Sequence, residues 1–523
     1  MAIIDFYDRG WNINPDGIAY IQGERSYTFN EVGELSCRIA NKLLALGLPK
    51  ETKGAVWSAN DVTAWACTLG LWRANMTWIP VNARNSAEEN HYILDAFDCE
   101  VMFYQSYFAE IIAELRPRLP QIKHWICIDA DAADADAADA PSLESWIAGQ
   151  PSTRPEVLIH LDDVIMLSPT GGTTGMPKGV MNTHRSTQTF IAHYTLACAY
   201  RNGDKPVNMA AAPMTHTAGL LAVPCTAQGG TVVVVTKPDP ALMLSAIAQH
   251  KVTEFFLPPT VIYKLLEIPG IEKVDFSSVK YLMYGAAPMS VEKLKKAIEL
   301  WGPIMAGGYG QTEAPAGIAN LRPDEHMHFG AIANDERLSS VGRPNPLIRV
   351  EMMNDAGGIL SRGQTGEICV RGDLVMKGYY KQPEKTAETI VNGWLHTGDI
   401  GHIDADGYLH ITDRKKDMII TGGFNVYPSE VEQVIWSHPS VQDCAVIGVP
   451  DEKWGEAVKA VVELNPGHIV TAETIIALCK ERLGSVMAPK SVDFVETLPR
   501  SPVGKVLKKD LRERYWKDQG RRV

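Results

Sequence analysis

The stretch Ser168–Gly179, which reads SPTGGTTGMPKG, is the densest motif of the chain and follows an apolar run, 164–167, with the composition of a β-strand. Its four glycines allow sharp turns and present backbone N–H groups to an anion, and its three threonines and Lys178 add further donors. A strand that leads into such a loop predicts a phosphate-binding site. The candidate ligands in the loop are Thr170, Gly171, Gly172, Thr173, Thr174, Gly175 and Lys178.

This loop is not a phosphate loop of the Walker type. That type requires the pattern G-x-x-x-x-G-K-[ST], whereas Met176 and Pro177 separate Gly175 from Lys178. The alternative interpretation is a surface loop rich in turn-forming residues, and for an isolated Gly/Thr loop the two are evenly matched. The rest of the chain decides between them.

The bulk composition predicts a soluble protein of several domains. The 523 residues are too many for one compact core, and 45% hydrophobic and 21% charged residues are ordinary for a globular chain. The formal net charge of −12 argues against non-specific binding to nucleic acid or to an anionic membrane. We therefore expect no nucleic-acid partner.

Cysteine usage and the apolar runs predict the compartment. The nine cysteines are scattered without a C-x-x-C pair, as expected of buried thiols in a reducing compartment. The N-terminus lacks the apolar core of a signal peptide, and the most apolar stretch, Val62–Val81, is interrupted by Arg73. We expect a cytoplasmic protein that does not span a membrane.

The order of predicted elements indicates an α/β fold. Asn30 is predicted to cap a helix that ends at Gly47, and β-branched runs such as Thr231–Thr236 alternate with helical patterns, which favours layered, largely parallel sheets. After Val350, glycine-containing turn pairs separate short strand-like segments, which predicts a small antiparallel β subdomain. A charged connector, Asp413–Asp417, then leads into a second mixed region.

The connector is predicted to mark a domain boundary. We expect a large N-terminal domain over residues 1–413, of mixed, layered sheets with helices, in which about 340–413 form the β-rich subdomain. A small α+β C-terminal domain is expected over residues 417–523.

The whole string at Ser168–Gly179 resembles the signature loop of the adenylate-forming, or AMP-binding, superfamily. This superfamily includes acyl- and aryl-CoA synthetases, peptide-synthetase adenylation domains and firefly luciferase. Further motifs occur in the family's order, so the resemblance extends from about Trp11 to Lys509. By this resemblance we identify the chain as a member of the acyl-/aryl-CoA synthetase branch, which implies a mobile C-terminal domain and the use of ATP, Mg²⁺ and CoA.

Four motifs resemble the family's nucleotide contacts. Tyr284–Pro288 is similar to the adenine-binding stretch, and Gly308–Glu313, which reads GYGQTE, is similar to the second ATP motif. Trp394–Asp399 resembles the ribose motif, and Asp413 with Arg414 follows at the expected place. The implied nucleotide contacts are Gly285, Ala286, Ala287, Gly308, Tyr309, Gly310, Thr312, Asp399, Ile411 and Arg414.

The resemblance also implies roles within these motifs. Tyr309 would stack on adenine, and Thr312 would donate to the α-phosphate. Glu313, together with Thr173, would hold Mg²⁺, a cation that prefers carboxylate and phosphate oxygens. Taken singly, each motif has a plain structural alternative, namely a strand-to-helix turn, a helix cap, a turn aspartate or a surface ion pair. The ordered set favours the site.

Pro213–Gly219 reads PMTHTAG and resembles the family's substrate-side histidine segment, which implies that His216 lies near the carboxylate of the acid. A lone histidine is more often a satisfied structural residue, but the flanking Pro213 and Gly219 favour the site interpretation. The implied acid-pocket residues are His216, Thr217, Gly308, Gly310 and Ala314.

The C-terminal motifs resemble the movable half of the family's active site. Lys416 stands at the hinge position, in a hinge over 414–416, and Lys505 corresponds to the lysine required for adenylation. Thr421–Glu430 and Asp451–Glu456 resemble loops that face the site during thioester formation. Ordinary turns are the alternative for these loops. The implied CoA contacts are Gly422, Gly423, Phe424 and Trp454.

Together the motifs predict an AMP-forming acid–CoA ligase that converts ATP, a small carboxylic acid and CoA to acyl-CoA, AMP and pyrophosphate. A free-standing adenylation enzyme that loads a carrier protein is the alternative, followed by a luciferase-like oxygenase. A non-enzymatic nucleotide-binding protein would be expected to have lost Glu313, Asp399 or Lys505, and all three are present. The implied catalytic residues are Lys505, His216, Thr312 and Glu313.

One departure from the family bears on the acid. Gly171 stands where many relatives have serine, which removes one hydroxyl from the loop, and some aryl-acid-activating relatives are similar there. The sequence thus favours an aromatic or medium-chain acid. A homodimer is compatible with it.

Overall fold

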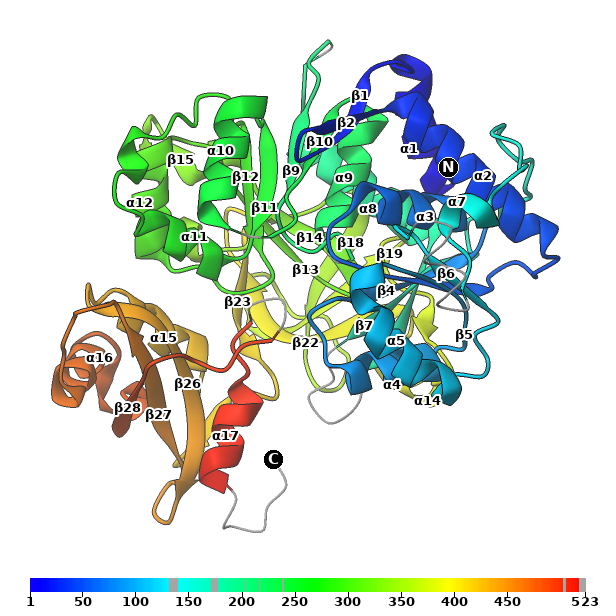
Figure 1. Cartoon of the computed structure of the whole chain (residues 1–523). Helices are drawn as coiled ribbons and strands as arrows, with labels where there is room; N and C mark the ends of the chain where they lie inside the picture. Colours follow the sequence, from blue (N-terminus) through cyan, green and yellow to red (C-terminus); the bar gives the residue numbers. More distant parts are fainter. Residues whose placement is uncertain are drawn as a thin grey trace.

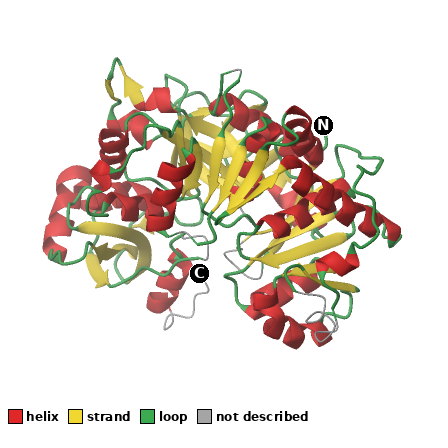
Figure 2. Cartoon of the chain, turned by 45° about the horizontal axis from the view of Figure 1, so that its top comes forward, coloured by secondary structure: helices red, strands yellow, loops and turns green. Residues whose placement is uncertain are grey.

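The computed structural model describes residues 1–130, 140–170, 177–201, 203–215, 217–237, 239–501 and 505–516 (Figure 1). In these residues, two large sheets and a smaller antiparallel sheet form the N-terminal part, and a further sheet forms the C-terminal part. Helices pack around the sheets (Figure 2). The predicted α/β class, with a large N-terminal and a small C-terminal domain, is confirmed.

The largest sheet has nine strands: β1 (Ile18–Gln22), β2 (Arg25–Thr28), β9 (Val207–Ala210), β10 (Thr231–Val234), β11 (Glu254–Leu257), β12 (Tyr281–Gly285), β13 (Met305–Gln311), β14 (Ala314–Leu321) and β17 (Arg343–Pro344). Their order is β17-β14-β13-β12-β11-β9-β10-β1-β2. The pairs from β13 through β1 are parallel, and the outer pairs are antiparallel. The carboxyl ends of β12 and β13 therefore lie together.

The second sheet has seven strands: β3 (Lys53–Ser58), β4 (Thr77–Asn82), β5 (Cys99–Tyr104), β6 (His124–Cys127), β7 (Val164–Thr170), β8 (Lys178–Thr183) and β20 (Gly378–Tyr379). Their order is β20-β8-β7-β4-β3-β5-β6. The strands β6 through β7 are parallel, whereas β7 and β8 form an antiparallel pair in which Thr170 lies opposite Lys178. The Gly/Thr motif thus links two paired strands.

Two five-stranded sheets follow later in the chain. The first is antiparallel and consists of β18 (Ile348–Met353), β19 (Gly366–Gly372), β21 (Ile390–Val391), β22 (Trp394–Ile403) and β23 (Leu409–Arg414). The second, in the C-terminal domain, consists of β24 (Ile419–Thr421), β25 (Phe424–Val426), β26 (Val441–Asp451), β27 (Gly455–Leu464) and β28 (Ser491–Val495). A hairpin of β15 (Met327–His328) and β16 (Ala331–Ile332) stands apart.

The described helices of the N-terminal domain are α1 (Ile3–Ile13), α2 (Phe29–Ala45), α3 (Val62–Arg73), α4 (Ala87–Ala96), α5 (Ala109–Leu115), α7 (Leu143–Trp146), α8 (His184–Ala197), α9 (Thr217–Ala227), α10 (Pro240–His250), α11 (Pro259–Leu266), α12 (Val291–Trp301), α13 (Asp335–Ser339) and α14 (Pro383–Thr389). Those of the C-terminal domain are α15 (Pro428–Trp436), α16 (Ala472–Met487) and α17 (Lys508–Trp516).

The start of α2 corrects one expectation. Thr28, not Asn30, is the N-cap, because its hydroxyl accepts from the N–H of Glu31 while the Glu31 carboxylate accepts from the N–H of Thr28. This capping box satisfies two helix-end N–H groups at once. Asn30 lies inside the helix, where its side chain accepts from the Trp11 indole at 2.7 Å.

The main core lies between the two large sheets and the helices that cover them. α3 is buried at every position except Thr63, and Trp65, Trp72 and Trp78 meet edge to face with ring centroids 5.5 to 6.0 Å apart. Among the described residues, no helix combines the length and hydropathy that a membrane span requires. All nine cysteines are buried free thiols, as predicted.

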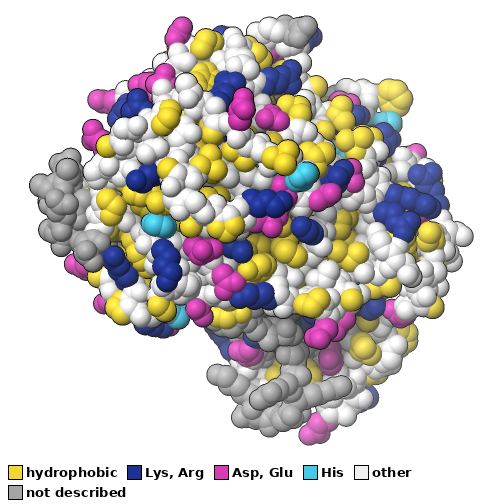
Figure 3. Space-filling view, turned by 90° about the vertical axis from the view of Figure 1, so that its right-hand side faces the viewer, with side chains coloured by type: hydrophobic (Ala, Val, Ile, Leu, Met, Phe, Trp, Pro, Cys, Tyr) yellow, Lys and Arg dark blue, Asp and Glu magenta, His cyan; other side chains and the backbone are white. Residues whose placement is uncertain are grey.

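The exposed surface is mixed in charge. On the face shown in Figure 3, basic and acidic side chains are interspersed among apolar ones. This mixture accompanies an overall formal net charge of −12.

A buried ion pair joins the first three helices and supports a stability prediction. The Arg73 guanidinium binds both carboxylate oxygens of Asp8, at 2.9 and 2.6 Å, and donates to Ser36 Oγ at 3.2 Å. Removing Arg73 leaves the Asp8 carboxylate with the more distant guanidinium of Arg154, at 3.5 Å, so we expect Arg73→Met to lower the free energy of unfolding by about 3 kcal/mol in urea titrations. The double variant Arg73→Met with Asp8→Asn should recover part of this loss, and equal losses would contradict the expectation.

Candidate functional site

The nucleotide motifs identified from the sequence meet at the carboxyl ends of β12 and β13. Gly285 lies opposite Gly308 in this parallel pair, so the segments that follow the two strands begin at the same end of the sheet. Ligands of open α/β sheets bind outside the carboxyl ends of parallel strands. The topology therefore places the Tyr284–Pro288 and Gly308–Glu313 motifs where a nucleotide site is expected.

Glycines are required at two of these positions by close backbone contacts. A Cβ atom on Gly285 would stand 2.5 Å from the carbonyl oxygen of Gly308, and one on Gly310 would stand 2.5 Å from the backbone nitrogen of Ala316. Ala286 adds a left-handed backbone conformation with φ of 67°. At both glycines the backbone of a neighbouring strand occupies the space that a side chain would need.

Tyr309 and Asp399 connect the largest sheet to the antiparallel sheet. The Tyr309 hydroxyl donates to Asp399 Oδ2 at 2.6 Å, and Arg414 Nε lies 3.6 Å from Asp399 Oδ1. Burial raises the pKa of Asp399, while Arg414 and Tyr309 act in the opposite direction. Two residues from separate motifs, Tyr309 and Arg414, thus converge on the carboxylate of a third motif.

Lys178 and Glu313 are brought together by a residue that sequence reasoning missed, Tyr379. The Lys178 ammonium lies 4.1 Å from the centre of the Tyr379 ring, and the Tyr379 hydroxyl donates to Glu313 Oε1 at 2.8 Å. Burial lowers the pKa of Lys178, and the Glu313 carboxylate partly restores it. Tyr379 comes from the short strand β20, which pairs with β8, and only this tertiary pairing identifies it.

Glu367 is a second residue that sequence reasoning missed. Its Oε1 accepts from the N–H of Gly398 at 3.1 Å, and its Oε2 lies 3.2 Å from His396 Nδ1 and 3.7 Å from Lys415 Nζ. The carboxylate therefore holds the turn that immediately precedes Asp399 and also reaches the connector. An isolated glutamate in a strand pattern carries no sequence signal for this role.

The charges of this cluster act on Lys505, although it comes from the far end of the chain. It ends a turn in which the Ser501 N–H donates to the Lys505 carbonyl at 2.8 Å and the Lys505 N–H donates to Ser501 Oγ at 3.2 Å. Burial and Arg414 lower the pKa of the ammonium, and the carboxylates of Asp399 and Glu313 oppose them. The lysine is thus within electrostatic reach of both carboxylates.

The predicted CoA segment lies at the turn between β24 and β25. Gly422 has φ of 58°, donates its N–H to the Trp454 carbonyl at 2.8 Å, and would place a Cβ atom 2.4 Å from the Trp454 ring. Phe424 and Trp454 are 58% and 42% exposed. In this orientation the aromatic side chains face solvent instead of contacting the Asp399 cluster.

Part of the predicted site lies outside the described residues. This applies to Gly171, Gly172, Thr173, Thr174, Gly175, His216 and the side chain of Thr217. Thr170 and Lys178 flank the Gly/Thr loop, and the backbone of Thr217 begins α9. Of the remaining predicted residues, Ala287 follows β12, Thr312 lies between β13 and β14, Ala314 is the buried first residue of β14, and Ile411 lies in β23 opposite Gly401.

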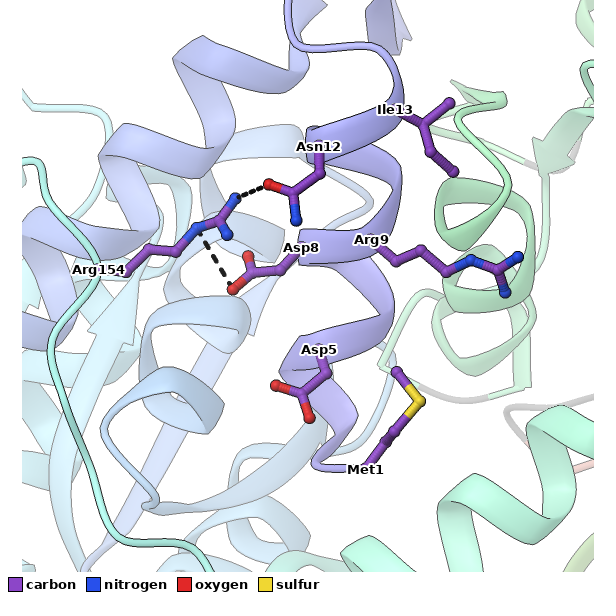
Figure 4. Close-up of a pocket in the computed structure, with 7 residues that line it drawn as sticks. All are labelled: Met1, Asp5, Asp8, Arg9, Asn12, Ile13 and Arg154. Carbon is purple, nitrogen blue, oxygen red and sulfur yellow. Dashed lines mark hydrogen bonds and ion pairs between the residues drawn. The ribbon is translucent and has the colours of Figure 1, made fainter.

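A surface hollow of about 500 Å³ on α1 is separate from this cluster (Figure 4). Arg154 lies across it, 3.5 Å from Asp8 Oδ2 and with Nη2 donating to Asn12 Oδ1 at 2.9 Å. Arg154 also stacks over Trp11, with its guanidinium carbon 4.3 Å from the ring centre. These contacts attach the connection between α7 and β7 to α1. None of them involves a predicted site residue.

Family models match both parts of the chain. The model described as AMP-binding enzyme matches residues 7–380, and the model described as AMP-binding enzyme C-terminal domain matches residues 430–505. The resemblance identified from the sequence motifs is confirmed by these two matches.

Curated relatives and solved structures agree with the family models. A medium/long-chain-fatty-acid–CoA ligase of Mycobacterium tuberculosis is 42% identical over 69% of this chain, and the match spans 63% of that protein, less than two thirds of its length. A feruloyl-CoA synthase of Amycolatopsis sp. is 33% identical over 96% of this chain and 97% of its own. The structure of an anthranilate CoA ligase in complex with anthranoyl-AMP superposes with a TM-score of 0.89, at 25% identity over 98% of this chain and 97% of that chain.

The connector residue Lys416 supports a pH prediction. Burial, followed by the Arg414 guanidinium, lowers the pKa of Lys416 to about 8. Lysine in an unfolded chain titrates near about 10.4, so the unfolded state binds more protons between these two values. The charge of Lys416 destabilises the fold fully below about pH 8, and this cost disappears as the pH rises toward about 10.4.

We therefore expect Lys416→Met to melt about 1–2 °C above the wild type at pH 7, with the difference shrinking toward zero by about pH 10.4 in thermal-shift scans. Lys415→Met is the matched control, because Lys415 is ion-paired with Asp355 at 2.6 Å and its removal should not raise the melting temperature. A Lys416→Met difference that stays constant with pH would contradict the prediction.

Proposed function

The chain belongs to the AMP-binding enzyme family, and we propose that it joins a carboxylic acid to CoA through an acyl-adenylate, consuming ATP and releasing AMP and pyrophosphate. The observation that carries the proposal is the meeting of Tyr309 and Arg414 at the Asp399 carboxylate, whose charge also acts on Lys505. A lysine from the C-terminal domain that approaches two motifs of the N-terminal domain is what adenylation requires. The names of CoA ligases among the relatives support the same class.

In the first step, a carboxylate oxygen of the acid attacks the α-phosphorus of ATP, and the bond to pyrophosphate breaks. Both reactants are anions, so catalysis depends on positioning and on positive charge. Asp399 accepts from the ribose hydroxyls and is held by Tyr309 at 2.6 Å. Lys505 lies between the acid and the α-phosphate, where it reduces their repulsion. Thr312, His216 and the Gly/Thr loop complete the predicted contacts.

Glu313 fits a Mg²⁺ site. Its Oε1 accepts from the Tyr379 hydroxyl at 2.8 Å, which orients the carboxylate and leaves its second oxygen for a cation. Mg²⁺ is commonly held by one or two carboxylates together with substrate phosphates, so few protein ligands are needed. A bound ion would neutralise part of the phosphate charge. Thr173 stays a predicted second contact.

In the second step, the thiol of CoA attacks the acyl carbon of the mixed anhydride, AMP leaves, and the thiol proton passes to solvent. In the adenylating orientation that we propose, Lys505 stands beside the anhydride. We propose that the C-terminal domain turns at Lys416, which removes Lys505 and brings Gly422, Gly423, Phe424 and Trp454 to the site. The solvent exposure of Phe424 and Trp454 supports this, because both side chains are available for a new contact.

The identity of the acid is the finer part of the proposal. The Gly171 substitution in the loop favours an aromatic or medium-chain acid, and the named relatives act on fatty, ferulic and anthranilic acids according to their descriptions. Transfer to a carrier protein remains the alternative for the second step. A cytoplasmic location and a homodimer stay predictions.

Replacing Lys505 separates the two half-reactions. We expect Lys505→Ala to slow ATP–pyrophosphate exchange by about 100-fold or more, since it removes the cation that offsets the anionic transition state. The conversion of supplied acyl-AMP to thioester should be largely retained. Lys509→Ala, on the neighbouring helix, is the control and should retain both activities. Equal losses of both half-reactions in Lys505→Ala would rule out the assignment.

The acid class is tested with a substrate panel. The rate of pyrophosphate release should be highest with aromatic or medium-chain acids. With acetate and with acids of sixteen or more carbons the rate should be about 10-fold lower. Each active acid is then offered with CoA and with a phosphopantetheinylated carrier protein. If thioester forms only on the carrier protein, the carrier protein replaces CoA as the acceptor in the second step. A preference for acetate would reject the aromatic or medium-chain class.

A further inference from the structure

The C-terminal domain contacts the N-terminal domain through the side chain of Gln433, on α15. Its Nε2 donates to the carbonyl of Met289 at 3.0 Å, and its Oε1 accepts from the N–H of Val291 at 3.4 Å. Both ends of one carboxamide are therefore paired with backbone. Reversing the amide would place donor against donor and acceptor against acceptor, so the pairing has one orientation.

The backbone that Gln433 binds is the continuation of the adenine motif. Met289 and Ser290 follow Pro288, and Val291 begins α12. On the N-terminal side, the Tyr263 hydroxyl accepts from the N–H of Ser290 at 2.7 Å. The first N–H groups of a helix have no partner within the helix, so the Val291 N–H is paired by the other domain. The segment is thus held from both domains.

The same helix is fastened to the segment that carries Lys505. Glu432, next to Gln433, is buried and lies 2.7 Å from Lys508 Nζ. Lys508 begins α17, and the Leu507 N–H donates to the Pro499 carbonyl at 2.8 Å, which closes the turn around Lys505. Displacing α15 therefore displaces Lys505.

The helix is also fastened to the connector. The N–H of Ser429, in the first turn of α15, donates to Asp413 Oδ2 at 2.9 Å, and its hydroxyl donates to the Thr412 carbonyl. α15 consequently joins three points: the end of β23, the adenine segment and the Lys505 turn. In Figure 1 it lies next to α11 and α12 of the N-terminal domain.

We infer that Gln433 is a positioning residue for adenylation: its two hydrogen bonds to Met289 and Val291 hold the C-terminal domain in the orientation that brings Lys505 to Asp399 and Glu313. The inference rests on the proposed function and adds to it a residue that, beside the Ser429 bonds to Asp413 and Thr412, favours one domain orientation. Gln433 does not contact the reacting atoms. A turn of the domain at Lys416 would move α15 and break both hydrogen bonds, so the contact favours the first half-reaction alone.

The test uses the full-length protein and Gln433→Met, which keeps the length of the side chain and removes both hydrogen bonds. Loss of two such bonds corresponds to about 10-fold in the balance between orientations. We expect kcat/KM of ATP–pyrophosphate exchange to fall about 10-fold, while conversion of supplied acyl-AMP to thioester is unchanged or faster. Glu481→Met, at an exposed position of α16, is the control and should match the wild type in both assays.

A readout that is independent of catalysis completes the test. Hydrogen exchange of the peptide 286–292 should be faster in Gln433→Met than in the wild type, because the Val291 N–H loses its partner, and the melting temperature should stay within about 2 °C. Unchanged exchange in this peptide, or equal loss of both half-reactions, would overturn the role of Gln433. A wild type that exchanges no pyrophosphate with any acid would instead refute the proposed function, and the peptide measurement would still decide whether Gln433 holds the domain.

Discussion

The buried carboxylate of Asp399 is the constraint on which the arrangement depends. A carboxylate in this position loses its hydration, so it requires donors and positive charge from the protein. The Tyr309 hydroxyl, 2.6 Å away, comes from the largest sheet, and Arg414 comes from the end of β23. Lys505 approaches from the C-terminal domain. One desolvated group thus draws together residues that are far apart in the sequence.

Two supporting residues, Glu367 and Tyr379, hold groups of the site in their orientations. Glu367 fixes the Gly398 N–H, one residue before Asp399, and Tyr379 fixes the Glu313 carboxylate. Neither residue belongs to a motif, and each acts by holding a motif residue in place. Functional groups that must be positioned to within a fraction of an ångström need such supporting contacts. The cluster around Asp399 therefore depends on residues that a motif search passes over.

Helix α15 links several parts of the structure to the C-terminal domain. α15 bears the contacts to Asp413, to Met289 and Val291, and, through Glu432, to Lys508. Because these contacts lie on one short helix, the position of Lys505 and the orientation of the domain change together. The exposed aromatic side chains of Phe424 and Trp454 lie elsewhere on the same domain. The proposed turn at Lys416 would therefore move all of these groups together.

The sequence alone determined the family and the α/β class and singled out the motif residues as candidates, because these depend on local features. The strand at Thr231–Val234 and the motifs that contain Gly285, Gly310 and Asp399 each occupy a short stretch whose chemistry can be recognised directly. It misplaced the cap of α2, since Thr28 and Asn30 are both suitable caps and only the reciprocal bond with Glu31 distinguishes them. The tertiary structure decided which groups form hydrogen bonds with each other: Tyr379 with Glu313, Glu367 with Gly398, and Gln433 with Met289. Pairings of this kind depend on sheet order and domain orientation, and no local pattern of residue types encodes them.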